Sequence, residues 1–194
     1  MSDPFETIKF SAEEAALIIR QSYGAVVPQG MGVAESLYDH DEITWLPASV
    51  TTYALGLGNP IRYADLQVGE TVLDIGSGAG IDTFIAARWV GLTGHVIGLD
   101  MTPEMLERAR INQQLLGLAN VEFREGMMEQ IPLDDASVDV IVSNGVINLS
   151  TEKRQTFREL YRVLKPGGRL VFSDSVVNGQ LPRSVLDSEA AFTG

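Results

Sequence analysis

A run of alternating glycines after an acidic residue is the part of the sequence with the clearest chemistry. It reads Asp74-Ile75-Gly76-Ser77-Gly78-Ala79-Gly80 and lies between an apolar run and a stretch of helical composition. Glycines let the backbone turn sharply and approach a ligand closely, and the helix that follows offers free N–H groups and a partial positive charge. Because such a loop can also be a plain strand–helix turn, its surroundings must decide whether it binds a ligand.

Asp100 is the residue that favours a binding site. It ends the next apolar run, Val96–Asp100, twenty residues after Gly80. A carboxylate there can accept hydrogen bonds from two ribose hydroxyls, whereas the alternative is an acid that stabilises the start of a helix at Pro103. We favour the ribose, because the carboxyl ends of neighbouring parallel strands face the ligand crevice of an open α/β sheet.

The glycine spacing distinguishes two classes of nucleotide. Dinucleotide loops carry glycine at the first, third and sixth positions, and the sixth position counted from Gly76 is Ile81. S-adenosylmethionine has no phosphate, so the loop needs only to pass close to its methionine part, with Asp74 near the ammonium group. The spacing therefore predicts S-adenosylmethionine as the cofactor, with a nicotinamide oxidoreductase as the weaker alternative.

Alternating strands and helices are expected to position these residues. Strands are predicted at 71–75, 96–100, 121–123, 138–142 and 169–173, and helices at 11–23, 81–90, 103–116 and 151–164. The first helix begins with a capping box of Ser11 and Glu14, and Thr102 is expected to cap the third. This order predicts an α/β fold with a doubly wound, mostly parallel sheet. Loops at 74–80, 100–101, 126–128 and 143–146 should then meet at one edge.

The segment ahead of the sheet is predicted to be a lid. Residues 25–62 carry many prolines and glycines and are expected to be irregular. We therefore divide the chain into a lid and substrate-pocket segment at 1–62 and a cofactor-binding core at 63–194. Tyr23, Trp45 and Tyr53 could line the substrate pocket, or could be core aromatics that join the lid to the sheet.

Five runs of the sequence resemble S-adenosylmethionine-dependent methyltransferases of the Rossmann-like class, and within that class the arsenite methyltransferase family. The runs are Leu55–Pro60, Asp74–Gly80, Gly98–Pro103, Ser143–Leu149 and Arg162–Gly168. The resemblance extends over residues 15–190 and is most specific around 140–150. It implies the fold described above and transfer of a methyl group from S-adenosylmethionine.

The resemblance also implies roles for single residues. Gly76, Ser77 and Gly78 are expected to contact the methionine part of the cofactor, within a cofactor loop bounded by Asp74 and Gly80. Asp100 should hold the ribose hydroxyls.

The adenine and the methyl group have their own expected neighbours. Met101 should pack on adenine and Met127 and Met128 should border it, although filling of the core is the alternative for the last two. Asn144 should lie near the methionine end of the cofactor and the substrate.

The chain departs from the arsenite methyltransferases at their cysteines. That family binds trivalent arsenic through thiolates, which are soft ligands for a soft centre, and this chain has no cysteine. Gly145 and Leu57 stand at two of the cysteine positions, and the region around Ala190 and Ala191 resembles the third. We therefore predict a small-molecule acceptor other than arsenite.

A second departure concerns the carboxyl end. Methyltransferases of this class usually add two antiparallel strands after the fifth, and about 20 residues follow strand 169–173 here. That strand would then be an exposed edge. Three explanations stay open: a fragment, a second copy in a homodimer that covers the edge, or cover by residues 175–194.

Composition restricts the remaining classes of function. The 194 residues carry 14 Lys and Arg against 26 Asp and Glu, a formal charge of −12. We therefore expect no nucleic-acid substrate and no binding to an anionic membrane. The absence of cysteine and of a signal peptide predicts a cytoplasmic protein. No metal site is expected, because His40 and His95 make no ligand pair.

Two functions remain in view. The first is an active methyltransferase, and the second is a catalytically silent S-adenosylmethionine-binding or regulatory protein. Residues considered for a general base or for the substrate are Tyr23, Tyr53, Asp82, Asn144 and Asn148, and no catalytic residue is assigned.

Overall fold

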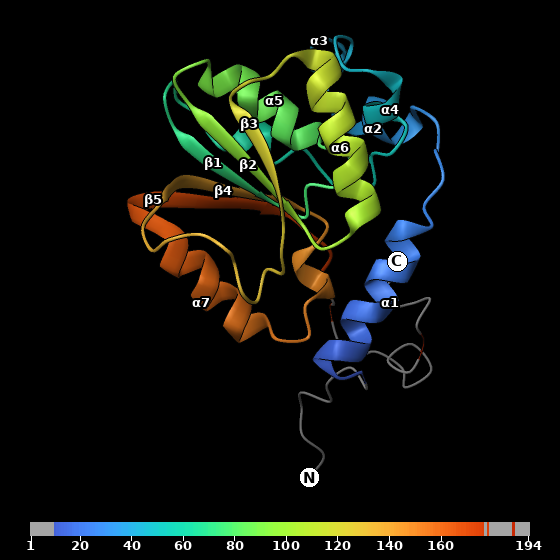
Figure 1. Ribbon diagram of the computed structural model, residues 1–194, viewed down its shortest axis with the longest axis vertical. Coiled ribbons are helices and arrows are strands. Elements are labelled where there is room, and N and C mark those ends of the chain that lie inside the picture. Colours follow the sequence, from blue (N-terminus) through green and yellow to red (C-terminus); the bar gives the residue numbers. More distant parts are fainter. Residues whose placement is uncertain (1–9, 177, 179–187, 189–194) are drawn as a thin grey trace.

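A five-stranded parallel sheet forms the centre of the protein (Figure 1), in a computed structural model that describes residues 10–176, 178 and 188. The strands are β1 (Thr71–Ile75), β2 (His95–Asp100), β3 (Val121–Glu125), β4 (Val138–Asn144) and β5 (Leu164–Ser173). Their order is β3-β2-β1-β4-β5, and all four neighbouring pairs are parallel. The order reverses between β1 and β4, which is where doubly wound sheets bind ligands. The predicted fold class is confirmed.

Helices cover both faces of the sheet. In Figure 1, α5 (Ile81–Val90) and α6 (Pro103–Leu116) lie on one side and α7 (Lys153–Val163) on the other. The face under α5 and α6 holds the larger apolar cluster, in which the rings of Phe84 and Phe123 meet edge to face with centroids 5.7 Å apart. Leu160 and Val163 of α7 close the smaller cluster on the opposite face. The two apolar clusters fix the strands and therefore the loops at their carboxyl ends.

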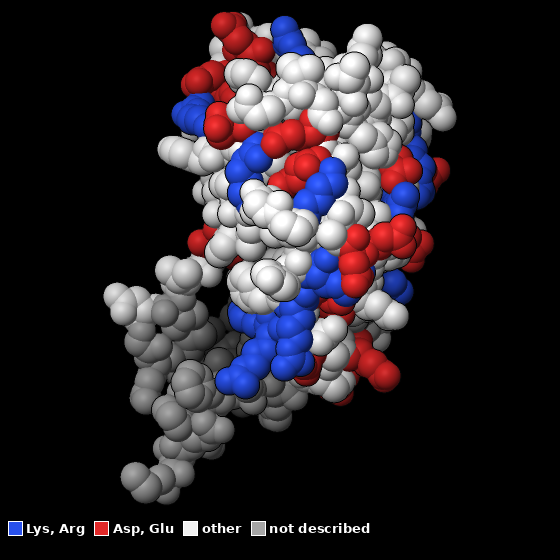
Figure 2. Space-filling model, turned by 90° about the vertical axis from the view of Figure 1, so that its left-hand side faces the viewer, with Lys and Arg blue, Asp and Glu red and all other residues white. Residues whose placement is uncertain are grey.

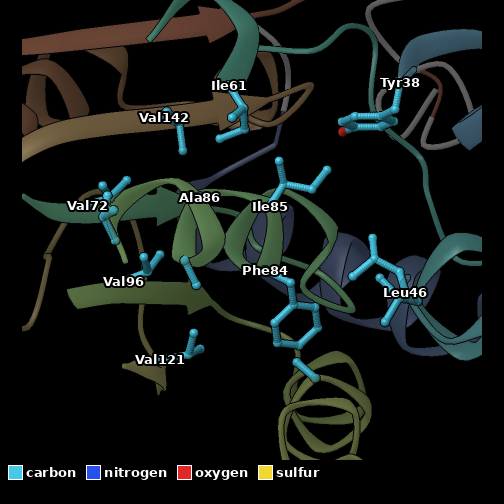
Figure 3. Packing of buried hydrophobic residues seen from close by; sticks show 14 of the residues in the cluster. Tyr38, Leu46, Ile61, Val72, Phe84, Ile85, Ala86, Val96, Val121 and Val142 are labelled. Carbon is cyan, nitrogen blue, oxygen red and sulfur yellow. The ribbon is translucent and has the colours of Figure 1, made fainter. Parts of the chain in front are cut away.

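The segment before β1 is more regular than predicted. It contains α1 (Ala12–Gly24), α2 (Gly32–Leu37), α3 (His40–Ile43), α4 (Ala48–Thr51) and the 3-10 helix η1 (Ile61–Tyr63). The expectation of an irregular stretch at 25–62 was wrong because short capped turns interrupt it, such as the capping box of Asp39 and Glu42. Figure 3 shows Leu46 and Ile61 of this segment in the same apolar layer as Phe84 and Val142.

Several element ends differ from prediction: β3 and β4 each extend two residues further, to Glu125 and Asn144, and α7 spans Lys153–Val163 instead of 151–164. β5 begins at Leu164, because Leu164 already pairs with Val138 before a register shift, so residues 165–168 belong to the strand. Thr102 precedes α6 as expected, but its side chain makes no capping bond. The predicted capping box of Ser11 and Glu14 is present, with bonds of 2.8 and 3.2 Å.

β5 is the last strand at one edge of the sheet. Among the described residues β5 pairs only with β4, and the predicted cover by residues 175–194 falls mostly outside those residues.

Figure 2 shows acidic and basic side chains interspersed over one face, with a group of basic side chains low on it. None of the helices in the described part of the chain is both long and apolar enough to cross a membrane.

Candidate cofactor pocket

A pocket opens at the carboxyl ends of β1, β2 and β4, where the four predicted loops meet. Its wall is completed by α1, by residues 50–56 and by the stretch that follows the 3-10 helix η2 (Ile147–Leu149). Of the residues that the sequence analysis assigned to the cofactor or the substrate, ten line it: Tyr23, Tyr53, Gly76, Ser77, Gly78, Asp100, Met101, Met127, Met128 and Asn144. Asp74, Gly80 and Asn148 do not line it.

The glycine loop takes a shape that needs glycine at its first position. Gly76 has φ +71°, and a Cβ there would lie 2.4 Å from Cγ2 of Val146. The N–H groups of Gly76 and Ser77 both donate to the carbonyl of Leu99, at 2.8 and 3.0 Å. The backbone is therefore folded tightly against β2, with the loop exposed to the pocket.

Asp100 fastens this loop to the next helix. Its Oδ2 accepts from the N–H of Gly78 and its Oδ1 from the N–H of Thr102, both at 2.8 Å. The helix-start role considered for Asp100 is thus present, and each oxygen keeps a second lone pair for a ligand. Desolvation raises the pKa of this carboxyl, against the lowering effect of hydrogen bonds from the backbone of Thr102, Gly78 and Met101 and from the side chain of Thr102.

Asp74 lies beneath the loop, away from the pocket. Its side chain is 2% exposed, and its Oδ2 accepts a bond of 2.5 Å from Oγ1 of Thr83. Burial, followed by the nearby charge of Asp82, raises the pKa of Asp74 well above its ordinary value. Gly80 also lies below, where a Cβ would press on Phe84 and Phe123.

Asp82, in the first turn of α5, lines the pocket, unlike Asp74. Its Oδ1 accepts from the hydroxyl of Tyr38 at 2.9 Å, and its Oδ2 accepts from Nδ2 of Asn144 at 3.0 Å. Desolvation raises the pKa of Asp82 to about 6, although both hydrogen bonds lower it. In the sequence Asp82 was singled out only as one of several polar residues near the site.

Asn144 holds residues 56–58, here called the roof, of which Gly56 lines the pocket. Its Oδ1 accepts from the N–H groups of Leu57 and Gly58 at 2.8 and 3.1 Å, and its Nδ2 donates to the carbonyl of Gly58 at 2.8 Å. A Cβ on Gly56 would lie 2.3 Å from this Nδ2. The amide of Asn144 is therefore occupied by protein groups, although the residue borders the pocket as expected.

The three methionines predicted beside adenine all line the pocket. Met128 is 9% exposed and joins the apolar cluster below the sheet, while Met101 and Met127 are partly exposed. Ala12, Ala15 and Ala16 of α1 face the same pocket. The sequence analysis missed these alanines, because small residues on a helix carry no chemical signal of their own.

The three residues considered for the substrate are placed differently. Tyr23 lines the pocket, and its pKa is raised by burial and by the charges of Asp100 and Asp174. Tyr53 lines it with its ring stacked under the guanidinium of Arg108 at 4.6 Å. Asn148 lies outside, where its N–H donates to Oδ2 of Asp174 at 3.0 Å. Trp45 does not line the pocket either and stacks with Arg88.

Two positions at which the arsenite methyltransferases carry cysteine lie side by side. A Cβ on Gly145 would be 3.2 Å from Cγ of Leu57. Leu57 is 52% exposed, so this corner presents an apolar side chain and bare backbone. Ala190 and Ala191 lie outside the described residues.

Charge sets this pocket apart from the rest of the surface. Within the described part of the chain its wall contains Asp82, Asp100 and Glu129 but no Lys, Arg or His. The ion pairs between described residues include none of Asp74, Asp82 and Asp100. Carboxylates removed from water without a cation are costly, so a positive ligand would lower the free energy of this site.

Comparison with known proteins identifies the family. Residues 66–193 match the family described as Methyltransferase domain. An arsenite methyltransferase of Halobacterium salinarum is 48% identical over 157 residues, which are 81% of this chain and 40% of that protein. The chain thus spans about two-fifths of the length of this curated relative.

Solved structures agree with the sequence match. An arsenic(III) S-adenosylmethionine methyltransferase from Chlamydomonas reinhardtii aligns with a TM-score of 0.62 and 37% identity, over 87% of this chain and 52% of that one. A SAM-dependent methyltransferase from Aquifex aeolicus aligns with a TM-score of 0.57 and 32% identity, over 64% of this chain and 68% of that one. The family predicted from the glycine loop and Asp100 is confirmed: the chain belongs to the S-adenosylmethionine-dependent methyltransferases.

Proposed function

We propose that this chain binds S-adenosylmethionine in the pocket and transfers its methyl group to a small-molecule acceptor. The observation that carries the proposal is the acidic wall without a cationic side chain. S-adenosylmethionine carries a sulfonium and an ammonium group, which these carboxylates would stabilise. The pyrophosphate of a nicotinamide dinucleotide would instead face three carboxylates with no Lys or Arg among the described lining residues, which argues against an oxidoreductase.

The pocket residues would divide the cofactor between them. We assign the methionine part to Gly76, Ser77 and Gly78, and the ribose hydroxyls to the free lone pairs of Asp100. Adenine would lie among Met101, Met127 and Met128, opposite the alanines of α1. Asn144 would act indirectly, by holding the roof over the methionine end.

For methyl transfer the protein would mainly align the methyl donor with the acceptor. When bound, S-adenosylmethionine supplies a methyl group already activated by the sulfonium. The loop, Asp100 and the roof would hold the reactants in line and exclude water, a contribution that reaches about 7–11 kcal/mol in well-oriented systems. A general base is needed only for an acceptor that must lose a proton, and we assign none.

The acceptor is proposed to be neither arsenite nor a strongly anionic molecule. Leu57 and Gly145 meet where soft thiolates would be required for trivalent arsenic. The acidic wall would repel a phosphate group, and the lining at Gly145 and Val146 is apolar. A neutral or cationic small molecule fits this surface best.

A pair of cysteines can test the rejection of arsenic. The double variant L57C/G145C would place two thiols close together, and we expect it to bind phenylarsine oxide while the cysteine-free protein does not. Intrinsic fluorescence titration measures this. Equal binding by both proteins would contradict the proposed rejection.

Transfer itself is tested with labelled cofactor. S-adenosylmethionine with a labelled methyl group, incubated with the protein and a broad metabolite extract, should label at least one small molecule. Tight cofactor binding without any labelled product would instead support a catalytically silent or regulatory protein.

We also propose a cytoplasmic homodimer in which a second copy covers the free edge of β5, with no nucleic-acid partner. The outer side of β5, which pairs with no strand in the described part of the chain, supports the dimer, and the net charge of −12 argues against a nucleic-acid partner. Light scattering should give twice the mass of 21.1 kDa, whereas a monomer at all concentrations would overturn it.

A further inference from the structure

We infer that Asp82, and not Asp74 of the glycine loop, is the positioning residue that pairs with the ammonium group of the cofactor. The inference rests on the proposed function, because it concerns the methionine end of the same pocket. It reverses the expectation from the sequence, in which the acid that opens the glycine motif was to lie near the ammonium.

The position of Asp82 favours this role. Asp82 lines the pocket beside the glycine loop and Asn144, although its residue is only 5% exposed. Each of its two oxygens accepts one hydrogen bond, Oδ1 from the hydroxyl of Tyr38 and Oδ2 from Nδ2 of Asn144. Each oxygen keeps a lone pair, so the carboxylate can accept a further N–H without losing either bond.

Asp74 is placed so that it cannot do the same. It lies outside the pocket wall, and its Oδ2 accepts the short bond from Thr83, a fully buried residue. We therefore assign Asp74 to the support of the strand–helix turn.

The partners of Asp82 explain why a cation is needed there. Tyr38 and Asn144 are neutral, and no Lys, Arg or His of the described residues forms an ion pair with Asp82. A buried carboxylate with neutral partners alone is disfavoured in its charged form. An ammonium group of a ligand provides the missing positive charge and three N–H donors.

The same carboxylate connects the cofactor with the roof. Asn144 donates one bond to Asp82 and also binds the backbone of Leu57 and Gly58. A cation bound to Asp82 would therefore lie next to the amide of Asn144, which holds the roof.

A comparison of two ligands and two variants tests the inference. S-adenosylhomocysteine carries the ammonium group, whereas 5′-methylthioadenosine lacks the amino-acid part. By calorimetry we expect D82N to weaken S-adenosylhomocysteine by about ten- to a hundredfold, as for the loss of a charged hydrogen bond. The affinity for 5′-methylthioadenosine should stay within about twofold. D74N, which alters a neighbouring buried acid, should change both affinities by the same factor.

The ratio of the two affinities decides between the outcomes. Partial unfolding of a variant lowers both apparent affinities together and leaves the ratio unchanged. An unchanged ratio in D82N, checked on protein with native circular dichroism, would overturn the inference, as would a changed ratio in D74N alone. Failure of the unaltered protein to bind either ligand would instead refute the proposed function.

Discussion

Two parts of the site are held in different ways: the glycine loop with Asp100, here called the floor, and the roof of residues 56–58. In the floor, Asp100 joins residues close in sequence, with Gly78 22 positions and Thr102 two positions away. In the roof, Asn144 binds Leu57 and Gly58, which precede it by 87 and 86 positions. The floor is thus a property of one βαβ unit, whereas the roof exists only after the whole sheet has formed.

The largest expected effect concerns the floor. Asp100→Ala removes the proposed acceptor of the ribose hydroxyls and leaves the N–H of Gly78 without its partner. We expect the affinity for S-adenosylhomocysteine to fall by about a hundredfold, because bonds to charged groups contribute roughly 1.5–3 kcal/mol each. Calorimetry measures the loss.

A matched control guards against a general effect of charge removal. Asp134→Ala alters an exposed acid far from the pocket wall and should leave the affinity within about twofold. An equal affinity of the Asp100 variant and the unaltered protein would show that the floor does not bind the cofactor.

Sequence reasoning succeeded where the chain itself carries the geometry. The alternating glycines and the spacing to Asp100 are local, and β1, α5 and β2 follow from apolar runs of ordinary length. The cofactor family and the parallel sheet could therefore be predicted. The alternative for Asp100 was also partly realised, since one of its oxygens does hold the start of α6.

The positions of the other site residues relative to the pocket depend on long-range packing, which the spacing of residues in the sequence does not reveal. Asp74 precedes the glycine loop in β1 and Asp82 follows it in the first turn of α5, and only packing decides which of the two carboxyls faces the pocket. Asn148 belongs to the run that most resembles the family, yet its backbone is held by Asp174 outside the pocket. Long-range contacts, not local pattern, determine these placements.

The roof can be disturbed by a single methyl group. Gly56→Ala would bring a Cβ to 2.3 Å from Nδ2 of Asn144. We expect the free energy of unfolding to fall by about 1–3 kcal/mol, as for overpacking at a filled site. Gly32→Ala, where a Cβ meets nothing within 4 Å, should change it by less than about 0.5 kcal/mol.

Urea unfolding of both glycine variants measures the difference. Equal stability of the two would mean that residues 56–58 are not held against Asn144, and the comparison between floor and roof would lose its basis.

The smallest expected effect is a dependence on pH. Asp82 has a pKa of about 6, so it is mostly protonated at pH 5 and mostly charged at pH 7. Tyr38 and Asn144 donate to it, while the charge of Glu42 on α3 raises its pKa and its own charge raises that of Asp74. Affinity for S-adenosylhomocysteine, whose ammonium group would pair with Asp82, should therefore rise by up to about tenfold from pH 5 to pH 7.

The sign for stability is the opposite. Because folding raises the pKa of Asp82, the folded state binds the extra proton. The contribution of Asp82 to stability of the ligand-free protein is therefore present at low pH and lost as the pH rises toward about 6. Titrations of S-adenosylhomocysteine at both pH values check the affinity, and a flat profile that D82N leaves unaltered would contradict it.

The central claim is that an acidic pocket wall, with no Lys, Arg or His among its described residues, selects an adenosyl sulfonium and excludes a dinucleotide. Calorimetric titration of the same preparation with S-adenosylmethionine and with NAD tests it most directly. We predict saturable binding of the first and no measurable heat with the second. Binding of NAD together with no response to S-adenosylmethionine would contradict the account.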